Sequence, residues 1–148
     1  MKLLLCFTIA AALLAGCSTP SSNDHLAGQI TTLKPKAETW EVLLDVLHAK
    51  GWTIETTNQF GVIAEGTRSR WSHYWPTKPR AKFRITDHRG GAAIAGSAII
   101  EYPDTPEGEA QKLKTLPHPM HEVQYLLDCV YARCLGQPEP EPKALPKS

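Results

Sequence analysis

The stretch RAKFRITDHRGGAAIAGSAIIEY, residues 80–102, decides the fold. Between positions 81 and 85, apolar Ala, Phe and Ile alternate with Lys and Arg, which is the period of a strand with one buried face. The Arg-Gly-Gly at 89–91 predicts a tight turn, and the run at 92–102 predicts a second strand paired to the first. Gly96 inside that run indicates either a bulge or the close approach of a helix.

A second hairpin precedes this one. Residues 52–57 alternate apolar and polar side chains and are rich in β-branched types, which favours a strand. Asn, Gln, Phe and Gly at 58–61 are typical of a turn, and Val-Ile-Ala at 62–64 resumes an extended run. The sequence therefore predicts four antiparallel strands in two consecutive hairpins.

Helices are predicted on both sides of the strands. Residues 35–51 begin with proline and end with glycine, which suits the first turn and the end of a helix. Residues 121–136 form a second amphipathic segment that also ends in glycine. The apolar stripes are Trp40, Leu43, Leu44 and Leu47 in the first helix, and Val123, Leu126, Leu127, Val130 and Cys134 in the second.

The order α-β-β-β-β-α predicts a two-layer α+β domain over residues 35–136, in which a four-stranded antiparallel sheet carries both helices on one face. Residues 17–34 are rich in Ser, Thr and Asn and predict a flexible tether. Residues 137–148 are rich in proline and too polar to pack, so they predict a disordered tail. Residues 1–16 predict a signal peptide.

The amino terminus has a recognisable pattern. Met1-Lys2 is followed by an apolar run over residues 3–14, which is shorter than the roughly 20 residues of a membrane-spanning helix. The run ends in Leu14-Ala15-Gly16-Cys17, which resembles the lipobox of bacterial lipoproteins. The resemblance implies that Cys17 receives a diacylglyceryl group, becomes residue one of the mature protein after cleavage, and is acylated on its new amine.

This resemblance implies a membrane partner and a location. Two lipid signals already anchor a protein stably, so three acyl chains should hold it permanently. In lipoproteins, Asp after the Cys tends to retain the protein on the inner membrane, whereas Ser18 stands here. The expected location is therefore the periplasmic face of the outer membrane. The order of predicted elements also resembles small α+β domains found in accessory lipoproteins of outer-membrane assembly.

Charge is distributed unevenly along the chain. Removal of Lys2 with the signal leaves 15 of the 16 basic residues against 15 acidic ones, so the mature chain is neutral overall. Seven basic residues nevertheless fall between Arg68 and Arg89, against one acidic residue, Asp87. Nucleic acid is not an expected partner of a neutral protein of the envelope.

The segment 68–84 mixes these basic residues with aromatic ones. Basic groups attract phosphate or carboxylate and aromatic faces stack on sugars, so the mixture suits an anionic glycan or lipid. The alternative is a solvated strand face whose charges protect a sheet edge from pairing. The candidate residues are Arg68, Arg70, Trp71, Tyr74, Trp75, Lys78, Arg80, Lys82 and Arg84.

Two cysteines remain after the signal peptide and the lipid attachment site. Cys129 and Cys134 are five residues apart on one predicted helix, which places their Cα atoms farther apart than a disulfide allows unless the last turn unwinds. A disulfide and two free thiols therefore stay open as alternatives. The same geometry argues against a zinc site with His118 and His121.

The sequence contains no nucleophile elbow, zinc-protease motif or glycine-rich phosphate loop, so it predicts no enzyme and no cofactor. Two hypotheses follow. The first is a non-enzymatic interaction module that binds an envelope protein or assists envelope assembly. The second is a binding module for an anionic envelope polymer or lipid through residues 68–84.

Overall fold

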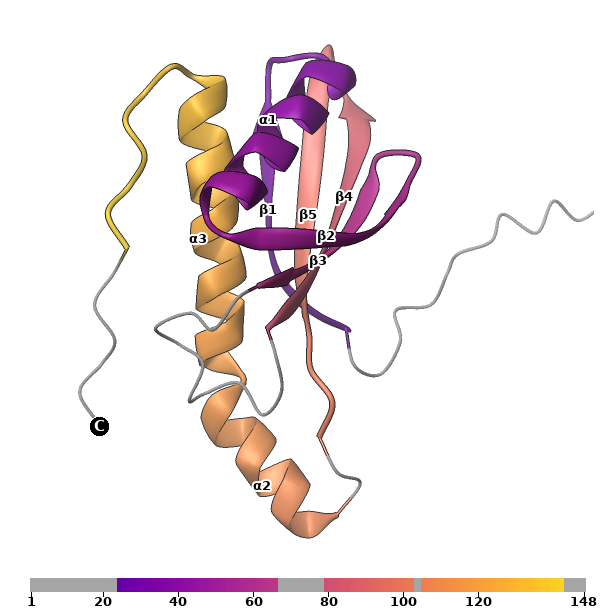
Figure 1. The fold of residues 1–148 in the computed structure, drawn as a ribbon, viewed down its shortest axis with the longest axis vertical. Coiled ribbons are helices and arrows are strands. Elements are labelled where there is room, and N and C mark those ends of the chain that lie inside the picture. The colour runs from indigo at the N-terminus through magenta and orange to yellow at the C-terminus, as the bar shows by residue number, and fades with distance from the viewer. Residues whose placement is uncertain (1–23, 67–78, 103–104, 143–148) are drawn as a thin grey trace, which may run out of the picture.

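A computed structural model describes residues 24–66, 79–102 and 105–142. Within them, a five-stranded antiparallel sheet has the order β1-β5-β4-β3-β2 and packs against helices (Figure 1). The elements are β1 (Asp24–Thr32), α1 (Lys36–Ala49), β2 (Trp52–Asn58), β3 (Gly61–Gly66), β4 (Arg80–His88), β5 (Gly91–Ile99), α2 (Pro106–Thr115) and α3 (Pro117–Cys134).

The α+β class, the antiparallel sheet and both hairpins are confirmed, but the prediction of four strands and two helices is wrong. The described residues contain a fifth strand, β1, inside the range 17–34 that was expected to be a flexible tether. A register shift between Leu26 and Gly28 interrupts the alternation of β1, which hides the strand from a pattern search. Residues 24–32 therefore belong to the sheet.

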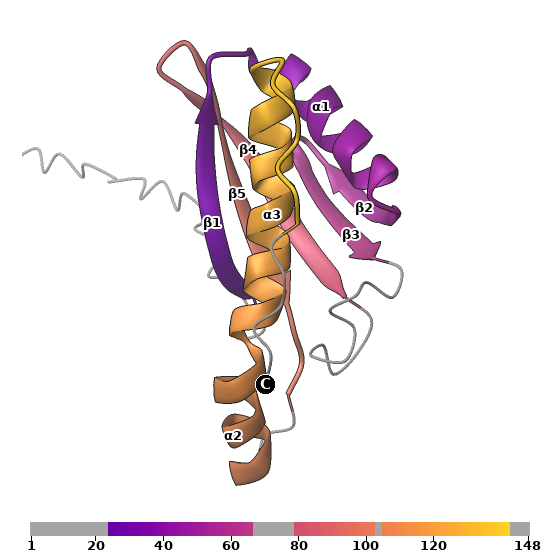
Figure 2. The same ribbon diagram turned by 90° about the vertical axis from the view of Figure 1, so that its left-hand side faces the viewer.

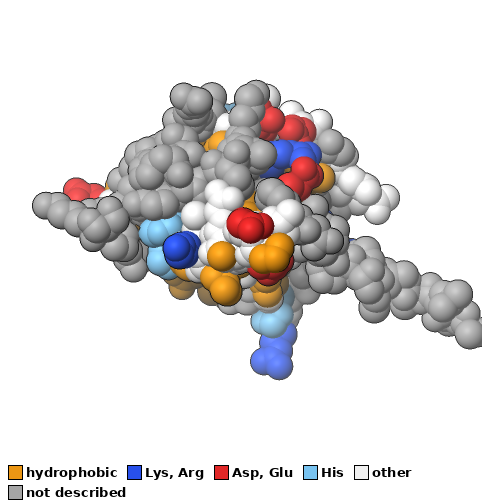
Figure 3. All heavy atoms as spheres, turned by 90° about the horizontal axis from the view of Figure 1, so that it is seen from below, with side chains coloured by type: hydrophobic (Ala, Val, Ile, Leu, Met, Phe, Trp, Pro, Cys, Tyr) orange, Lys and Arg blue, Asp and Glu red, His pale blue; other side chains and the backbone are white. Residues whose placement is uncertain are grey.

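The additional helix, α2, was missed for a different reason. Only Gly108 is buried in it, so α2 has no apolar stripe. Its start is stabilised locally, because the Thr105 hydroxyl accepts a hydrogen bond from the Gly108 amide at 3.1 Å. Seen from the end where α2 lies, the described side chains mix apolar, acidic, basic and histidine groups (Figure 3).

The core lies between one face of the sheet and helices α1 and α3. Helix α3 contacts β1 and β5, α1 contacts β2, β4 and β5, and the two helices contact each other (Figure 2). A Cβ atom at Gly96 would lie 2.8 Å from Val123 Cγ1 on α3, closer than real Cβ contacts. The glycine of β5 therefore permits the close approach of a helix, one of the two predicted explanations.

Helix α1 buries a different stripe from the predicted one. Leu43 and Leu47 are fully buried as expected, but Val46 and Thr39 complete the buried face. Trp40 and Leu44 are only partly buried at the border of the core. A polar residue such as Thr39 cannot be placed inside a core by an apolar pattern.

The tail prediction is also partly wrong, because residues 137–142 have a defined position. The chain turns at Gly136, which has a φ of 67°, and returns beside α3 (Figure 1). The carboxylate of Glu139 lies 2.6 Å from Lys50 Nζ at the end of α1 and 2.5 Å from Arg133 Nε on α3. One side chain of the tail thus joins the ends of both helices.

This contact predicts a dependence on pH. The hydrogen bond from Lys50 is the main reason that the pKa of Glu139 lies below its ordinary value. A carboxyl group with a lowered folded-state pKa stabilises the fold above its unfolded-state pKa, and this contribution is lost as the pH falls through the folded-state value. Glu139→Gln should lower the free energy of unfolding by up to about 1 kcal/mol at neutral pH.

Urea denaturation of both proteins at a series of pH values measures this effect. The difference between wild type and Glu139→Gln should shrink as acid protonates the wild-type carboxylate. A difference that stays constant from neutral pH to pH values below the pKa of Glu139 would contradict the assigned contact.

Candidate functional site

One face of the sheet points away from α1 and α3. On β4, the buried residues Ala81, Phe83 and Ile85 face the helices, so the residues between them face the other way. The described helices leave this second surface, the open face, uncovered. By alternation and strand register the open face consists of Asp24, Leu26, Gln29 and Thr31 on β1, Ala93, Ala95, Ser97 and Ile99 on β5, Arg80, Lys82, Arg84 and Thr86 on β4, and Ile63 and Glu65 on β3.

The predicted row of Arg80, Lys82 and Arg84 lies together on the open face. Two of these three cations have carboxylate partners inside the domain. Arg80 donates from Nε and Nη2 to one oxygen of Glu55 on β2, at 3.1 and 2.8 Å. Lys82 Nζ lies 3.0 Å from the carboxylate of Asp24 on β1. These pairs cross the sheet in opposite directions and neutralise most of the positive row.

Arg84 differs from its two neighbours. It is exposed and forms no ion pair with any described residue. Arg84 and Lys82 border a shallow hollow of about 420 Å³ at the turn of the β2–β3 hairpin. Asn58 and Gln59 of that turn also line the hollow. Arg84 is thus the member of the row that remains available to an external anion.

The other predicted members of the segment lie outside the described residues, as does the predicted lipid attachment site. They are Arg68, Arg70, Trp71, Tyr74, Trp75, Lys78 and Cys17. Gly66 and Arg80, which lie before and after these undescribed residues, are at the same end of the sheet as Asp24, because Glu65 is the register partner of Arg80, and Arg80 and Asp24 are both register partners of Ile99.

Both thiols are free, which is the second of the two alternatives for Cys129 and Cys134. Cys129 is fully buried, and burial raises the pKa of its thiol. Cys134 is half-buried at the end of α3, and burial raises the pKa of its thiol as well. A protonated thiol is a poor nucleophile, so neither site is activated for covalent chemistry.

Among the described residues, no three His, Cys, Asp or Glu side chains gather in a way that could hold a metal ion. The described helices also include none with the length and hydropathy of a membrane-spanning helix. Comparison with known proteins finds no family model that matches the chain and no significant match to a curated protein.

Proposed function

We propose that this chain is a lipid-anchored lipoprotein of the periplasmic face of the outer membrane, and that its domain is a non-enzymatic interaction module that assists envelope assembly. The open face is proposed as the surface that binds an envelope protein. The observation that supports this choice is the internal pairing of Arg80 with Glu55 and of Lys82 with Asp24.

Internal pairing matters because it changes which ligand the face suits. A surface that has neutralised its own charges attracts a polyanion weakly. On the same face Ile63 of β3 and Ser97 and Ile99 of β5 are half-buried, and Leu26 of β1 is 62% exposed. Apolar and small residues flanked by satisfied polar groups are typical of protein interfaces, which have an apolar centre and a polar rim.

The position of β1 in the sequence also limits how far the domain could lie from an acylated Cys17. Only residues 18–23 separate Cys17 from Asp24, so the two Cα atoms lie at most about 25 Å apart. Acylation of Cys17 would therefore keep the Asp24 end of the sheet near the headgroups. The proposed partner is accordingly an envelope protein that is located at or near the same membrane.

Photo-cross-linking in intact cells tests this proposal. A photoreactive residue in place of Ser97, at the centre of the open face, should give a discrete protein adduct. The matched control is the same residue in place of Asp45, which is exposed on α1. Adducts of equal yield and equal mass from both positions, or none from position 97, would contradict binding through the open face.

The second candidate function is binding of an anionic envelope glycan or lipid through residues 68–84. The position of Arg84 favours it, since this exposed cation borders the 420 Å³ hollow beside Lys82. Such binding should weaken steeply as salt is raised, whereas contact with an apolar protein surface should not.

A further inference from the structure

A second hollow lies at the far end of the sheet from Asp24. It has a volume of about 490 Å³ and lies between the β1–α1 turn, the β4–β5 turn and the end of α3. We name it the end hollow. The residues that give it its chemistry are Leu33, Tyr131, Leu135, Lys34, His88 and Arg89.

The apolar residues of the end hollow are exposed to an unusual degree. Leu33 is 86% exposed, Leu135 45% and Tyr131 43%. Among the described residues only two other large apolar side chains, Leu26 and Leu113, are comparably exposed. A single exposed leucine is ordinary on a protein surface, but the convergence of three such side chains on one hollow indicates an interaction site.

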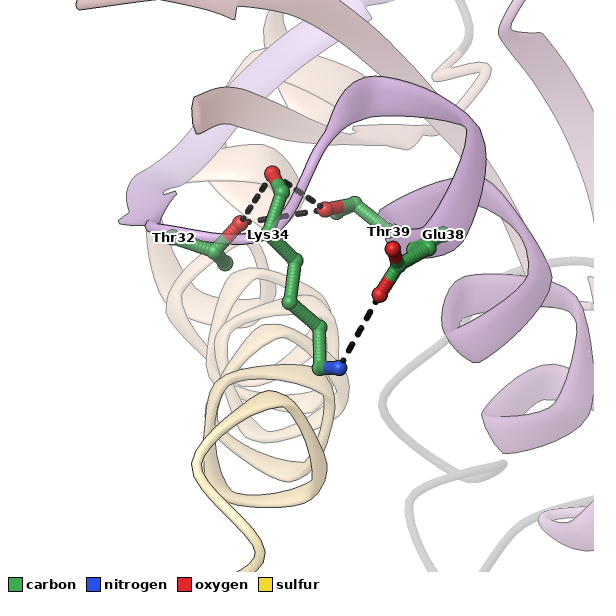
Figure 4. Close-up of polar contacts among 4 residues, drawn as sticks. All are labelled: Thr32, Lys34, Glu38 and Thr39. Atoms are coloured by element: carbon green, nitrogen blue, oxygen red, sulfur yellow. Dashed lines mark hydrogen bonds and ion pairs between the residues drawn. The ribbon is translucent and has the colours of Figure 1, made fainter. Parts of the chain in front are cut away.

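Thr32 and Lys34, the neighbours of Leu33 in the chain, both make polar contacts with Thr39 of α1 (Figure 4). The Thr39 hydroxyl donates to the Lys34 carbonyl at 3.2 Å, and the hydroxyl oxygens of Thr32 and Thr39 lie 3.0 Å apart. The start of β5 packs directly against the same segment, because a Cβ atom at Gly91 would lie 1.9 Å from the Thr32 carbonyl oxygen. These contacts fix the backbone of the turn that carries Leu33, which lowers the entropic cost of ordering this segment on binding.

The ionisable side chains of Lys34, His88 and Arg89, which line the end hollow, are all basic. Lys34 and Arg89 contribute cations and His88 an imidazole, and no acidic side chain lines the hollow. Lys34 Nζ lies 3.2 Å from a carboxylate oxygen of Glu38, but the Glu38 side chain is 60% exposed, against 28% for Glu55, so this pair is the weaker one and opens at little cost. Arg89 forms no ion pair with a described residue.

We propose that the end hollow is a docking site for a segment of another protein in which an apolar side chain is flanked by carboxylates. The apolar side chain would contact Leu33, Tyr131 and Leu135, and the carboxylates would pair with Lys34 and Arg89. A protein fits better than an acyl chain, because lipid and small-molecule sites enclose most of their ligand, whereas this hollow is open and Leu33 projects from it. The inference goes beyond the proposed function, because it concerns a different surface and does not depend on acylation of Cys17.

The chain carries its own reporter for this site. Cys134 lines the end hollow, whereas Cys129 is fully buried, so alkylation of the folded protein, measured on the peptide that contains both residues, should modify Cys134 and not Cys129. The probes are two synthetic peptides that differ only in charge, one with the core Glu-Leu-Phe-Glu and one with Lys-Leu-Phe-Lys. The Glu peptide should slow alkylation of Cys134 by iodoacetamide several-fold at saturation, and the Lys peptide should not.

Substitutions test whether the Glu peptide protects Cys134 by binding in the end hollow. Leu33→Ser and Arg89→Gln should each abolish the protection, with unfolding transitions like that of the wild type. Leu113→Ser is the matched control, since Leu113 is 80% exposed on α2, away from the end hollow, and its loss should leave protection unchanged.

Three results would overturn the proposal. They are equal protection by both peptides, no protection by either, and stronger protection by anionic phosphatidylglycerol vesicles than by the Glu peptide. The vesicle result would assign the end hollow to lipid. None of these results bears on the adduct expected from position 97, so this inference and the proposed function fail separately.

Discussion

Replacing Phe83 with alanine is expected to lower the free energy of unfolding by about 3–5 kcal/mol, the usual cost of truncating a buried phenylalanine. Phe83 is fully buried on β4, in the middle of the sheet. Its register partners are Val62 on β3 and Gly96 on β5. A Cβ atom at Gly96 would lie 3.1 Å from Phe83 Cε1, so the ring packs closely over this glycine.

Urea denaturation of the purified protein measures this cost. Leu44→Ala is the matched control, because Leu44 belongs to the predicted apolar stripe of α1 but is only partly buried. It should cost clearly less than Phe83→Ala. An equal cost for both variants would mean that the sheet does not form the centre of the core.

Replacing Cys17 with serine is expected to abolish lipid attachment completely. The hydroxyl of serine does not replace the thiol that receives the diacylglyceryl group in lipoproteins, so neither cleavage before residue 17 nor acylation of its amine should follow. Metabolic labelling with a fatty acid measures the outcome directly. The Cys17→Ser chain should carry no label and should accumulate as uncleaved precursor or as protein not held by lipid.

The control for this prediction is another cysteine of the same region. Cys6 lies inside the predicted signal peptide, so Cys6→Ser should be labelled like the wild type. Label on the Cys17→Ser chain, or its loss from the Cys6→Ser chain, would show that the Leu14–Cys17 pattern is not a lipobox.

The central sheet could be predicted because its pattern is local. Alternation over 81–85 and the turn before Gly91 identify the β4–β5 hairpin without any tertiary information. Strand β1 could not be predicted, since its register shift breaks the alternation and its position depends on pairing with β5, whose partner residues follow 60 to 75 positions later. Helix α2 was missed because it buries almost nothing.

In the candidate site, too, local features could be predicted from the sequence and long-range contacts could not. That Arg80, Lys82 and Arg84 share one face follows from the period of a strand. The sequence pattern does not predict that two of these cations are neutralised, because Glu55 is 25 residues from Arg80 and Asp24 is 58 residues from Lys82. The pairing depends on the strand order, and the proposal of a protein ligand for this face rests on it.

The salt dependence of the cross-link at position 97 tests the central claim most directly. In isolated envelopes, the range of electrostatic interactions falls from about 10 Å at 0.1 M salt to about 3 Å at 1 M. If the open face binds a protein through its apolar and small residues, the yield of the adduct should be the same at both concentrations. A steep loss of the adduct at 1 M salt would contradict this and would favour an anionic ligand at Arg84.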